Sequence, residues 1–412
     1  MMKHPERHQA KRVDVPYRCA ALTDIVYHGR AEDTKELRRG MREAQSAFYP
    51  PAPTLRPFVG EMHGHTNLSD GTPDIDTYFT RLRDVARFDF AVVSDHDHGG
   101  VGKPALWEGS PSKWDVIKEA VKRYREEGKF TTILAYERDS YPFYDNLVFY
   151  FRDDDAALVR DVRDGELTAQ RLREILADET VIIAPHDTYL MGSSTDFAAL
   201  DVDLITPLME VISRGDAAEY MGNPAFVGKS CFEGGFLQDA LKKGARIGVL
   251  GASDDHKGMG GLLVEERGYP GMYPGVTGVW AEENTHDAIF DAIRAKRTYA
   301  FMLGRPEGDM RGKMEIDFRI NGHWMGETIR RPADGDLSIF LSVKADVPVK
   351  QVTLVKNCRN YVMLSEKNDA MTLTQLLFDY KQENDTDYYY LRVELADGRF
   401  GWCSPVWVEK EG

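Results

Sequence analysis

The stretch Phe90-Ala91-Val92-Val93-Ser94-Asp95-His96-Asp97-His98 joins a short apolar run to a dense group of imidazoles and carboxylates. Four apolar residues in succession are typical of a strand that is buried on both faces of a parallel sheet. Imidazole and carboxylate are the ligands that zinc, manganese and iron accept. The stretch therefore predicts a buried strand with metal-binding residues at its end.

Four other segments repeat this design, in which an apolar run ends at histidine or carboxylate. They end at His63-Gly64-His65 followed by Asp70, at Glu137, at Pro185-His186-Asp187 and at Asp254-Asp255-His256. Six of the 11 histidines of the chain fall in the five segments. One such histidine is more simply explained as a hydrogen-bonded residue, but five strand ends with the same chemistry indicate one shared metal cluster. A barrel builds its active site in this way, from the carboxyl ends of its strands.

The arrangement of these segments along the chain predicts an α/β domain over residues 58–305. Helical apolar spacing between the strand-like runs predicts helices over residues 76–87, 114–126, 167–176, 236–243 and 284–297. Alternating strands and helices indicate a parallel sheet, open or closed. Ligands from five strand ends meet at one point only if the sheet curls, which favours an irregular barrel. Residues 1–57 are expected to form an N-terminal extension and linker, with a helix over 34–48.

The pattern changes after about residue 310. Apolar residues alternate with period two over residues 315–320, 337–343 and 390–395, and Asn321-Gly322 and Asp397-Gly398 are tight-turn pairs. Residues 312–412 are therefore expected to form a small all-β, sandwich-like unit, called the β module below. We expect it to have a structural or oligomerising role, with a homo-oligomer as one outcome. Its tryptophans could bind sugar rings, but a buried position in the sandwich explains them better.

Composition excludes several classes of function. The chain has 412 residues and a net charge of −15, which disfavours binding to nucleic acid, because that needs clustered Lys and Arg. No apolar stretch approaches the roughly 20 residues of a membrane span. The polar start of the chain lacks the apolar core of a secretion signal, and the four cysteines are widely spaced. These features predict a cytoplasmic protein that does not bind nucleic acid.

Local spacing ranks the candidate ligands. His63 and His65 are alternate residues of a strand, so both can face one metal. Of Asp95 and His96, one should be a ligand and the other its hydrogen-bonded partner. Glu137 has two oxygens with which it could bridge two metals. Asp70 could equally be a ligand or an Asx turn; Asp97, His98 and Asp187 are better explained as loop residues near the site.

The order of the motifs, HxH-x4-D-G, then S-D-H, a lone Glu, P-H and S-D-D-H, resembles the polymerase and histidinol phosphatase (PHP) superfamily. This resemblance implies a metal-dependent phosphoesterase on a distorted seven-stranded (β/α) barrel with two or three divalent ions (zinc, manganese or iron). It implies that Glu137 bridges the first ion to a second, held by His186. It implies that the first ion is held by His63, His65, Glu137 and Asp254. It implies that a third ion is held by Asp70, His96 and His256.

Several segments, among them Gly222-Asn223-Pro224, are similar to the carbaryl-hydrolase-like branch, in which a β module commonly follows the barrel. Members of the family usually carry a metal-binding histidine just before the position of Asn146, where this chain has Tyr144-Asp145. Asp145 could supply an oxygen ligand that favours manganese or iron. Alternatively, it is a solvated loop residue, and the second metal is weakly held or absent.

The expected reaction is hydrolysis of a small-molecule phosphate mono- or diester by metal-activated hydroxide. We assign catalytic roles to His96, His256 and Asp254. Neighbouring cations that could bind an anionic substrate are Arg138, Arg214 and Lys257. One alternative is a carboxylic ester, amide or carbamate hydrolase that uses the same site. Another is a metal- or carbohydrate-binding protein without catalytic activity.

Overall fold

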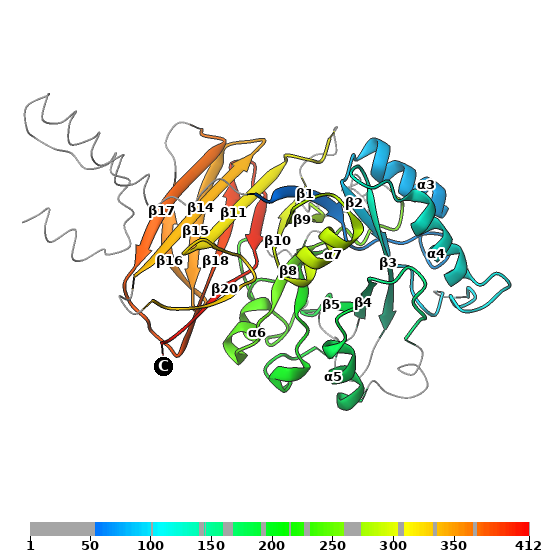
Figure 1. The fold of residues 1–412 in the computed structure, drawn as a ribbon, viewed down its shortest axis with the longest axis horizontal. Coiled ribbons are helices and arrows are strands. Elements are labelled where there is room, and N and C mark those ends of the chain that lie inside the picture. Colours follow the sequence, from blue (N-terminus) through cyan, green and yellow to red (C-terminus); the bar gives the residue numbers. More distant parts are fainter. Residues whose placement is uncertain are drawn as a thin grey trace, which may run out of the picture.

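The computed structural model describes residues 54–99, 102–139, 144, 146–159, 168–190, 195–213, 216–225, 231–258, 273–303, 309–332, 336–365 and 369–411. The helix expected over residues 34–48, together with Asp145 and Arg214, lies outside these ranges. An α/β part and the β module lie side by side (Figure 1). The strands of the module run from yellow to red in the figure, and the α/β part runs from blue to yellow-green.

The core of the α/β part is a mixed sheet. Strands β1 (Arg56–Glu61), β2 (Phe90–Val93) and β3 (Thr131–Asp139) run parallel. Beyond β3, the antiparallel strands β4 (Asn146–Phe151) and β5 (Val181–His186) follow. On the other side of β1, strands β9 (Gly275–Ala281) and β10 (Thr298–Met302) are also added in antiparallel order. A separate sheet contains β6 (Leu208–Ser213), β7 (Asp216–Ala217) and β8 (Gly248–Gly251), with β6 and β8 parallel.

The sheet differs from the expected parallel, seven-stranded barrel. Among the described residues, no strand pairing joins β5 to β6, so hydrogen bonds do not close a seven-stranded barrel. The connection between β3 and β4 covers only residues 140–145, which is too short for the crossover that parallel strands need. Strands β3 and β5 are both antiparallel to β4, so the strands that carry the predicted ligands run in the same direction, as expected. The expectation of an all-parallel sheet was wrong, because β4 and β9 are inserted antiparallel to their neighbours and a fully apolar strand has the same pattern in either orientation. The sheet nevertheless curls at the site, where Gly64 forms an isolated parallel bridge with Asp255.

The predicted helices are confirmed, with shifted ends. They are α3 (Ile75–Thr80) continued by the π-helical turn η2 (Arg81–Val85), α4 (Lys113–Tyr124), α5 (Ala169–Ala177), α6 (Leu237–Lys243) and α7 (His286–Arg294). A 3-10 turn, η4 (Val202–Leu204), precedes β6. The Ser112 hydroxyl accepts a hydrogen bond at the start of α4, and Gly244 ends α6 in the left-handed conformation, with a φ of 96°. None of the described helices has the length and apolar character that a transmembrane span requires.

The β module is a two-layer sandwich, as expected. One sheet contains β12 (His323–Trp324), β11 (Met314–Ile320), β14 (Leu337–Ala345) and β17 (Thr372–Asp379). The second layer contains β13 (Thr328–Arg330), β20 (Val406–Glu409), β18 (Thr386–Leu395), β19 (Phe400–Cys403), β15 (Val349–Lys356) and β16 (Arg359–Leu364). Trp402 and Trp407 are buried in the module. Strand β19 also pairs with β10, so this second layer continues the sheet of the α/β part.

Candidate metal centre

The ends of β1 and β8 hold three of the predicted ligands in place. The amide of Asp254 donates to the carbonyl of His63 (3.1 Å), and the amide of His65 donates to the carbonyl of Asp255 (2.8 Å). These backbone bonds set the two segments side by side just beyond the sheet. The side chains of His63, His65 and Asp254 are therefore positioned by main-chain pairing, although Asp254 follows His65 by 189 residues in the sequence.

Four buried donor atoms converge at this point. His63 Nε2 lies 3.1 Å from His65 Nε2 and 3.0 Å from Glu137 Oε2. Asp254 Oδ1 lies 3.0 Å from His65 Nε2 and 3.5 Å from His63 Nε2. His65 Nε2 is also 3.2 Å from Glu137 Oε2. We call His63, His65, Glu137 and Asp254 the inner cluster.

The spacing of the inner cluster suits a transition metal. Four ligands at about 2.1 Å from a tetrahedral ion lie about 3.4 Å apart, close to the separations observed here. Glu137 is fully buried, and its second oxygen, Oε1, has no hydrogen-bond partner in the structure. An unsatisfied buried carboxylate oxygen is costly unless a cation is present. The inner cluster therefore fits a divalent metal ion.

A second group of ligands lies next to the first and is more open to solvent. The His65 ring stacks between those of His96 and His256, with centroids 4.6 and 4.3 Å away. Asp70 faces all three rings, and its Oδ2 lies 3.2 Å from His256 Nε2. His256 Nδ1 donates to the carbonyl of Asp254, which directs Nε2 toward Asp70 and the other ligands of this group. We call His65, Asp70, His96 and His256 the outer cluster.

Glu210 is a central residue that was not among the predicted ligands. Its two oxygens contact His63 Nδ1 at 2.8 Å and His186 Nδ1 at 2.9 Å. A carboxylate that accepts the Nδ1 proton directs the other ring nitrogen toward a metal. Its sequence signal differs from that of Glu137, because Glu137 follows an apolar run whereas Glu210 lies inside the run Leu208-Met209-Glu210-Val211-Ile212.

Two further buried acids support the loops of the site. Glu61 accepts hydrogen bonds from the amides of His63 and Ser253 and from the Ser253 hydroxyl, and so joins the ends of β1 and β8. Asp95 accepts from the amides and hydroxyls of Thr66 and Ser69. Asp95 therefore holds the loop that carries Asp70, while its neighbour His96 is itself a member of the outer cluster.

Burial and charge set the protonation of the site. Burial lowers the pKa of His96 to about 4, so its ring is neutral and able to bind a metal at neutral pH. Burial alone would raise the pKa of Glu137, but its electrostatic interactions with the His63 and His96 imidazoles and its hydrogen bonds with His63 and His65 hold the pKa well below its usual value. Burial also lowers the pKa of His186, yet the carboxylates of Asp187 and Glu210 outweigh this and raise it to about 10. The surroundings of His186 thus favour a positive charge.

The predicted substrate-binding cations have different surroundings. Arg138 is buried, and its Nη1 lies 3.3 Å from Asp97 Oδ2. Lys257 is exposed, and Arg214 lies outside the described residues. His98 is largely exposed beside Asp97.

Tyr144 fills space in the core. It is fully buried, and its hydroxyl donates to the carbonyl of Leu204. Its neighbour Asp145 is not among the described residues, so its role as a ligand stays a prediction.

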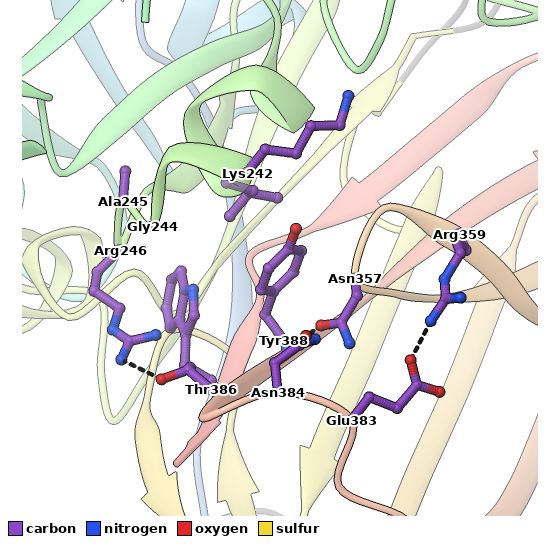
Figure 2. A pocket seen from close by; sticks show the side chains of 12 residues that line it. Lys242, Gly244, Ala245, Arg246, Asn357, Arg359, Glu383, Asn384, Thr386 and Tyr388 are labelled. Atoms are coloured by element: carbon purple, nitrogen blue, oxygen red, sulfur yellow. Dashed lines mark hydrogen bonds and ion pairs between the residues drawn. The ribbon is translucent and has the colours of Figure 1, made fainter. Parts of the chain in front are cut away.

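A separate cavity of about 660 Å³ lies between the end of α6 and the β module (Figure 2). None of the residues that line it belongs to the inner or outer cluster. Its cations Lys242, Arg246 and Arg359 have acidic partners in Asp239, Glu409 and Glu383. The charge of this cavity is therefore largely compensated.

Comparisons with known proteins give distant similarities. A family model described as a protein of unknown function (DUF3604) matches residues 265–305. An uncharacterized protein of Chlamydia pneumoniae is 21% identical over 88% of this chain and 58% of its own length. An uncharacterized protein of Chlamydia muridarum is 20% identical over 85% of this chain and 57% of its own length. The chain thus spans less than two thirds of these relatives.

One solved structure resembles the chain at low similarity. It is a two-domain protein from Bacteroides vulgatus that contains a predicted PHP-like metal-dependent phosphoesterase. It is 14% identical, covers 87% of this chain and 98% of its own, and has a TM-score of 0.41. At this TM-score, the assignment of a function depends on the geometry of the site.

Proposed function

We propose that this chain is a metal-dependent hydrolase that cleaves a small-molecule phosphate mono- or diester. The observation that carries the proposal is the inner cluster, in which four buried donor atoms lie 3.0–3.5 Å apart beside a more open outer cluster. A buried site alone would store an ion. In the adjoining outer cluster, Asp70 and His256 are partly exposed to solvent, so a substrate could reach this side of the site.

The inner and outer clusters would have different roles in the reaction. The inner cluster would hold an ion, and His63 is oriented for this by Glu210. A bound divalent ion lowers the pKa of water toward neutrality and so supplies hydroxide as the nucleophile. Attack of this hydroxide oxygen on phosphorus would form a new P–O bond and break the ester P–O bond, and the leaving oxygen would take up a proton from solvent. His96 and His256, at the open side of the cluster, are the groups that we propose to position the phosphate.

A carboxylic ester or carbamate is the second candidate substrate class. Arg138 is buried against Asp97, so this predicted phosphate-binding cation already has an acidic partner. A neutral carbonyl substrate would need no such cation. Both reactions use the same nucleophile.

Metal content and activity test the proposal together. The protein would be loaded with manganese or zinc, desalted, and measured by elemental analysis. Activity would then be measured on para-nitrophenyl phosphate, bis-para-nitrophenyl phosphate and para-nitrophenyl acetate. We expect His63→Ala and Asp254→Ala to lose metal and activity. We expect His256→Ala to keep its fold and the inner metal but lose most turnover.

His323→Ala is the matched control, because His323 is an exposed histidine of the β module. It should change neither metal content nor activity. Less than one metal ion per chain in the wild-type protein after loading would refute the proposal. Activity on the acetate alone would favour the second substrate class.

A further inference from the structure

The structure points to a ligand role for Asp187, and we propose that Asp187 binds a second metal ion together with His186 and Asp254. This inference rests on the proposed function, because it concerns an ion beside the inner cluster. Asp187 follows directly after β5, so its carboxylate and the His186 ring leave the sheet at the same edge.

Two carboxylate oxygens lie close to one buried ring nitrogen at this place. His186 Nε2 lies 3.1 Å from Asp187 Oδ2 and 3.5 Å from Asp254 Oδ2. Two ligands at about 2.1 Å from one ion, at angles between about 90° and 110°, lie about 3.0–3.5 Å apart. Both distances fall in this range. His186 is fully buried, and Asp187 is 7% exposed.

The contact between His186 and Asp187 lacks the geometry of a hydrogen bond. Although the two atoms are close enough, His186 Nε2 has no hydrogen-bond partner in the structure. The other nitrogen, Nδ1, is already directed at Glu210 and lies 3.0 Å from the Ser213 hydroxyl. A buried ring nitrogen that is close to two carboxylates but aligned with neither is the arrangement of ligands around a shared ion.

Asp254 connects this place to the inner cluster. Its Oδ1 belongs to the inner cluster, 3.0 Å from His65 Nε2, while its Oδ2 faces His186. The carboxylate of Asp254 can therefore bridge two ions. With one imidazole and two carboxylates, the second site is richer in oxygen than the first and should prefer manganese or iron to zinc.

The test is the metal content of Asp187 variants. Wild type, Asp187→Ala and Asp187→Asn would be loaded with manganese, desalted and analysed for metal, with circular dichroism as a check of the fold. We expect Asp187→Ala to hold one manganese ion fewer per chain than wild type. Asp187→Asn, which keeps the shape of the side chain, should weaken the second ion by roughly 10–100-fold in a chelator competition. Asp201→Ala, at an exposed aspartate that pairs with Arg173, is the control.

The outcomes separate this inference from the proposed function. If wild type binds two ions and Asp187→Ala also binds two, the role of Asp187 is refuted while the proposed function stands. If only Asp145→Ala loses the second ion, Asp145 is the ligand and the inference is again overturned. If wild type binds one ion and NMR shows His186 protonated at neutral pH, a proton occupies the place of the second metal ion. The role of Asp187 is then refuted, and the proposed function stands. If wild type binds none, the proposed function itself fails.

Discussion

At the scale of the residue, Glu210 shows how one carboxylate can organise a site without joining the inner cluster. It holds the Nδ1 atoms of His63 and His186, which come from β1 and β5. Burial alone would raise the pKa of Glu210, but the charges of the two histidines lower it to about 2. Glu210 is therefore ionised at neutral pH in the folded protein, and it orients both imidazole rings through their Nδ1 atoms.

Replacing Glu210 with glutamine should weaken metal binding while the protein stays folded. The amide keeps the size of the side chain but can accept from only one of the two rings. Replacing a residue that hydrogen-bonds to a metal ligand typically lowers the metal affinity by roughly 10–100-fold. Affinity would be measured by competition with a chelator, and Glu174→Gln, at an exposed position, is the control. Unchanged affinity would show that Glu210 does not orient the ligands.

Asp89, away from the metal centre, makes stability depend on pH. Its carboxylate accepts a hydrogen bond from the amide of Val59, but burial dominates and raises its pKa from 3.8 to about 6. The folded state therefore keeps this proton to a higher pH than the unfolded state. The contribution of Asp89 to the free energy of unfolding therefore falls as the pH rises from about 4 to about 6, and it stays low above that range.

We therefore expect the change in the free energy of unfolding caused by Asp89→Asn to be more favourable at pH 7 than at pH 4. Asparagine can still accept from the Val59 amide but carries no charge to bury. A pKa shift of this size corresponds to about 2–3 kcal/mol. Urea unfolding of both proteins at the two pH values gives the difference, in which the pH dependence of all other groups cancels. A difference between variant and wild type that does not change with pH would contradict the assignment.

At the scale of the element, the end of β1 is packed against α3 with no room for a side chain. A Cβ atom on Gly64 would lie 2.3 Å from the hydroxyl oxygen of Tyr78, which donates to the carbonyl of Val92. Gly64 separates His63 from His65, so a displacement here moves both ligands. The close approach of strand and helix is thus linked to the geometry of the inner cluster.

Gly64→Ala should destabilise the protein by about 1–3 kcal/mol, as overpacking of a core does, and weaken metal binding. The double variant Gly64→Ala, Tyr78→Phe removes the clashing hydroxyl and should recover part of the metal affinity. Thermal unfolding and a metal titration of the single and double variants would test this. If Tyr78→Phe does not improve the Gly64→Ala protein, the clash is not the cause.

At the scale of the whole molecule, a buried network joins the β module to the α/β part. Glu219 is fully buried and accepts hydrogen bonds from the Tyr390 hydroxyl at 2.6 Å and from Trp402 Nε1 at 2.9 Å. Arg392 Nη1 lies 3.3 Å from the same carboxylate. Because β19 also continues the sheet from β10, the module and the α/β part form one structural unit.

Glu219→Ala should lower the free energy of unfolding by about 3–5 kcal/mol, since it leaves the buried Arg392 without its acidic partner, although Tyr220 and Asn360 still accept from it. Glu282→Ala, at an exposed position, should have little effect. Urea unfolding would measure both. A loss below about 1 kcal/mol would show that the network contributes little to the docking of the module.

Truncation after Arg311 should prevent the α/β part from folding into a metal-binding form. It would expose the edge of β10 and remove the carbonyl of Ile316, which accepts from Trp280 Nε1 at 2.8 Å. Solubility and metal content of the truncated chain are the measurements. A soluble truncated protein with full metal content would show that the module does not support the site.

The sequence by itself determined the elements and the chemistry of the site. Apolar periodicity and capping residues predicted the helices from α3 to α7 and the alternating strands of the β module, because these depend on local spacing. Histidine and carboxylate at five strand ends predicted the residues of the inner and outer clusters, because no other common function places these residue types there together.

Only the tertiary structure decided the antiparallel insertion of β4 and β9, the role of Glu210 and the joining of the two parts through β10 and β19. An apolar strand has the same pattern whichever way its neighbour runs, so β4 and β9 gave no signal of their antiparallel pairing. Glu210 acts through histidines that lie far from it in the sequence. The proximity of His186 to Asp254 likewise exists only once the ends of β5 and β8 are brought together, because it depends on distances between strand ends rather than on residue order.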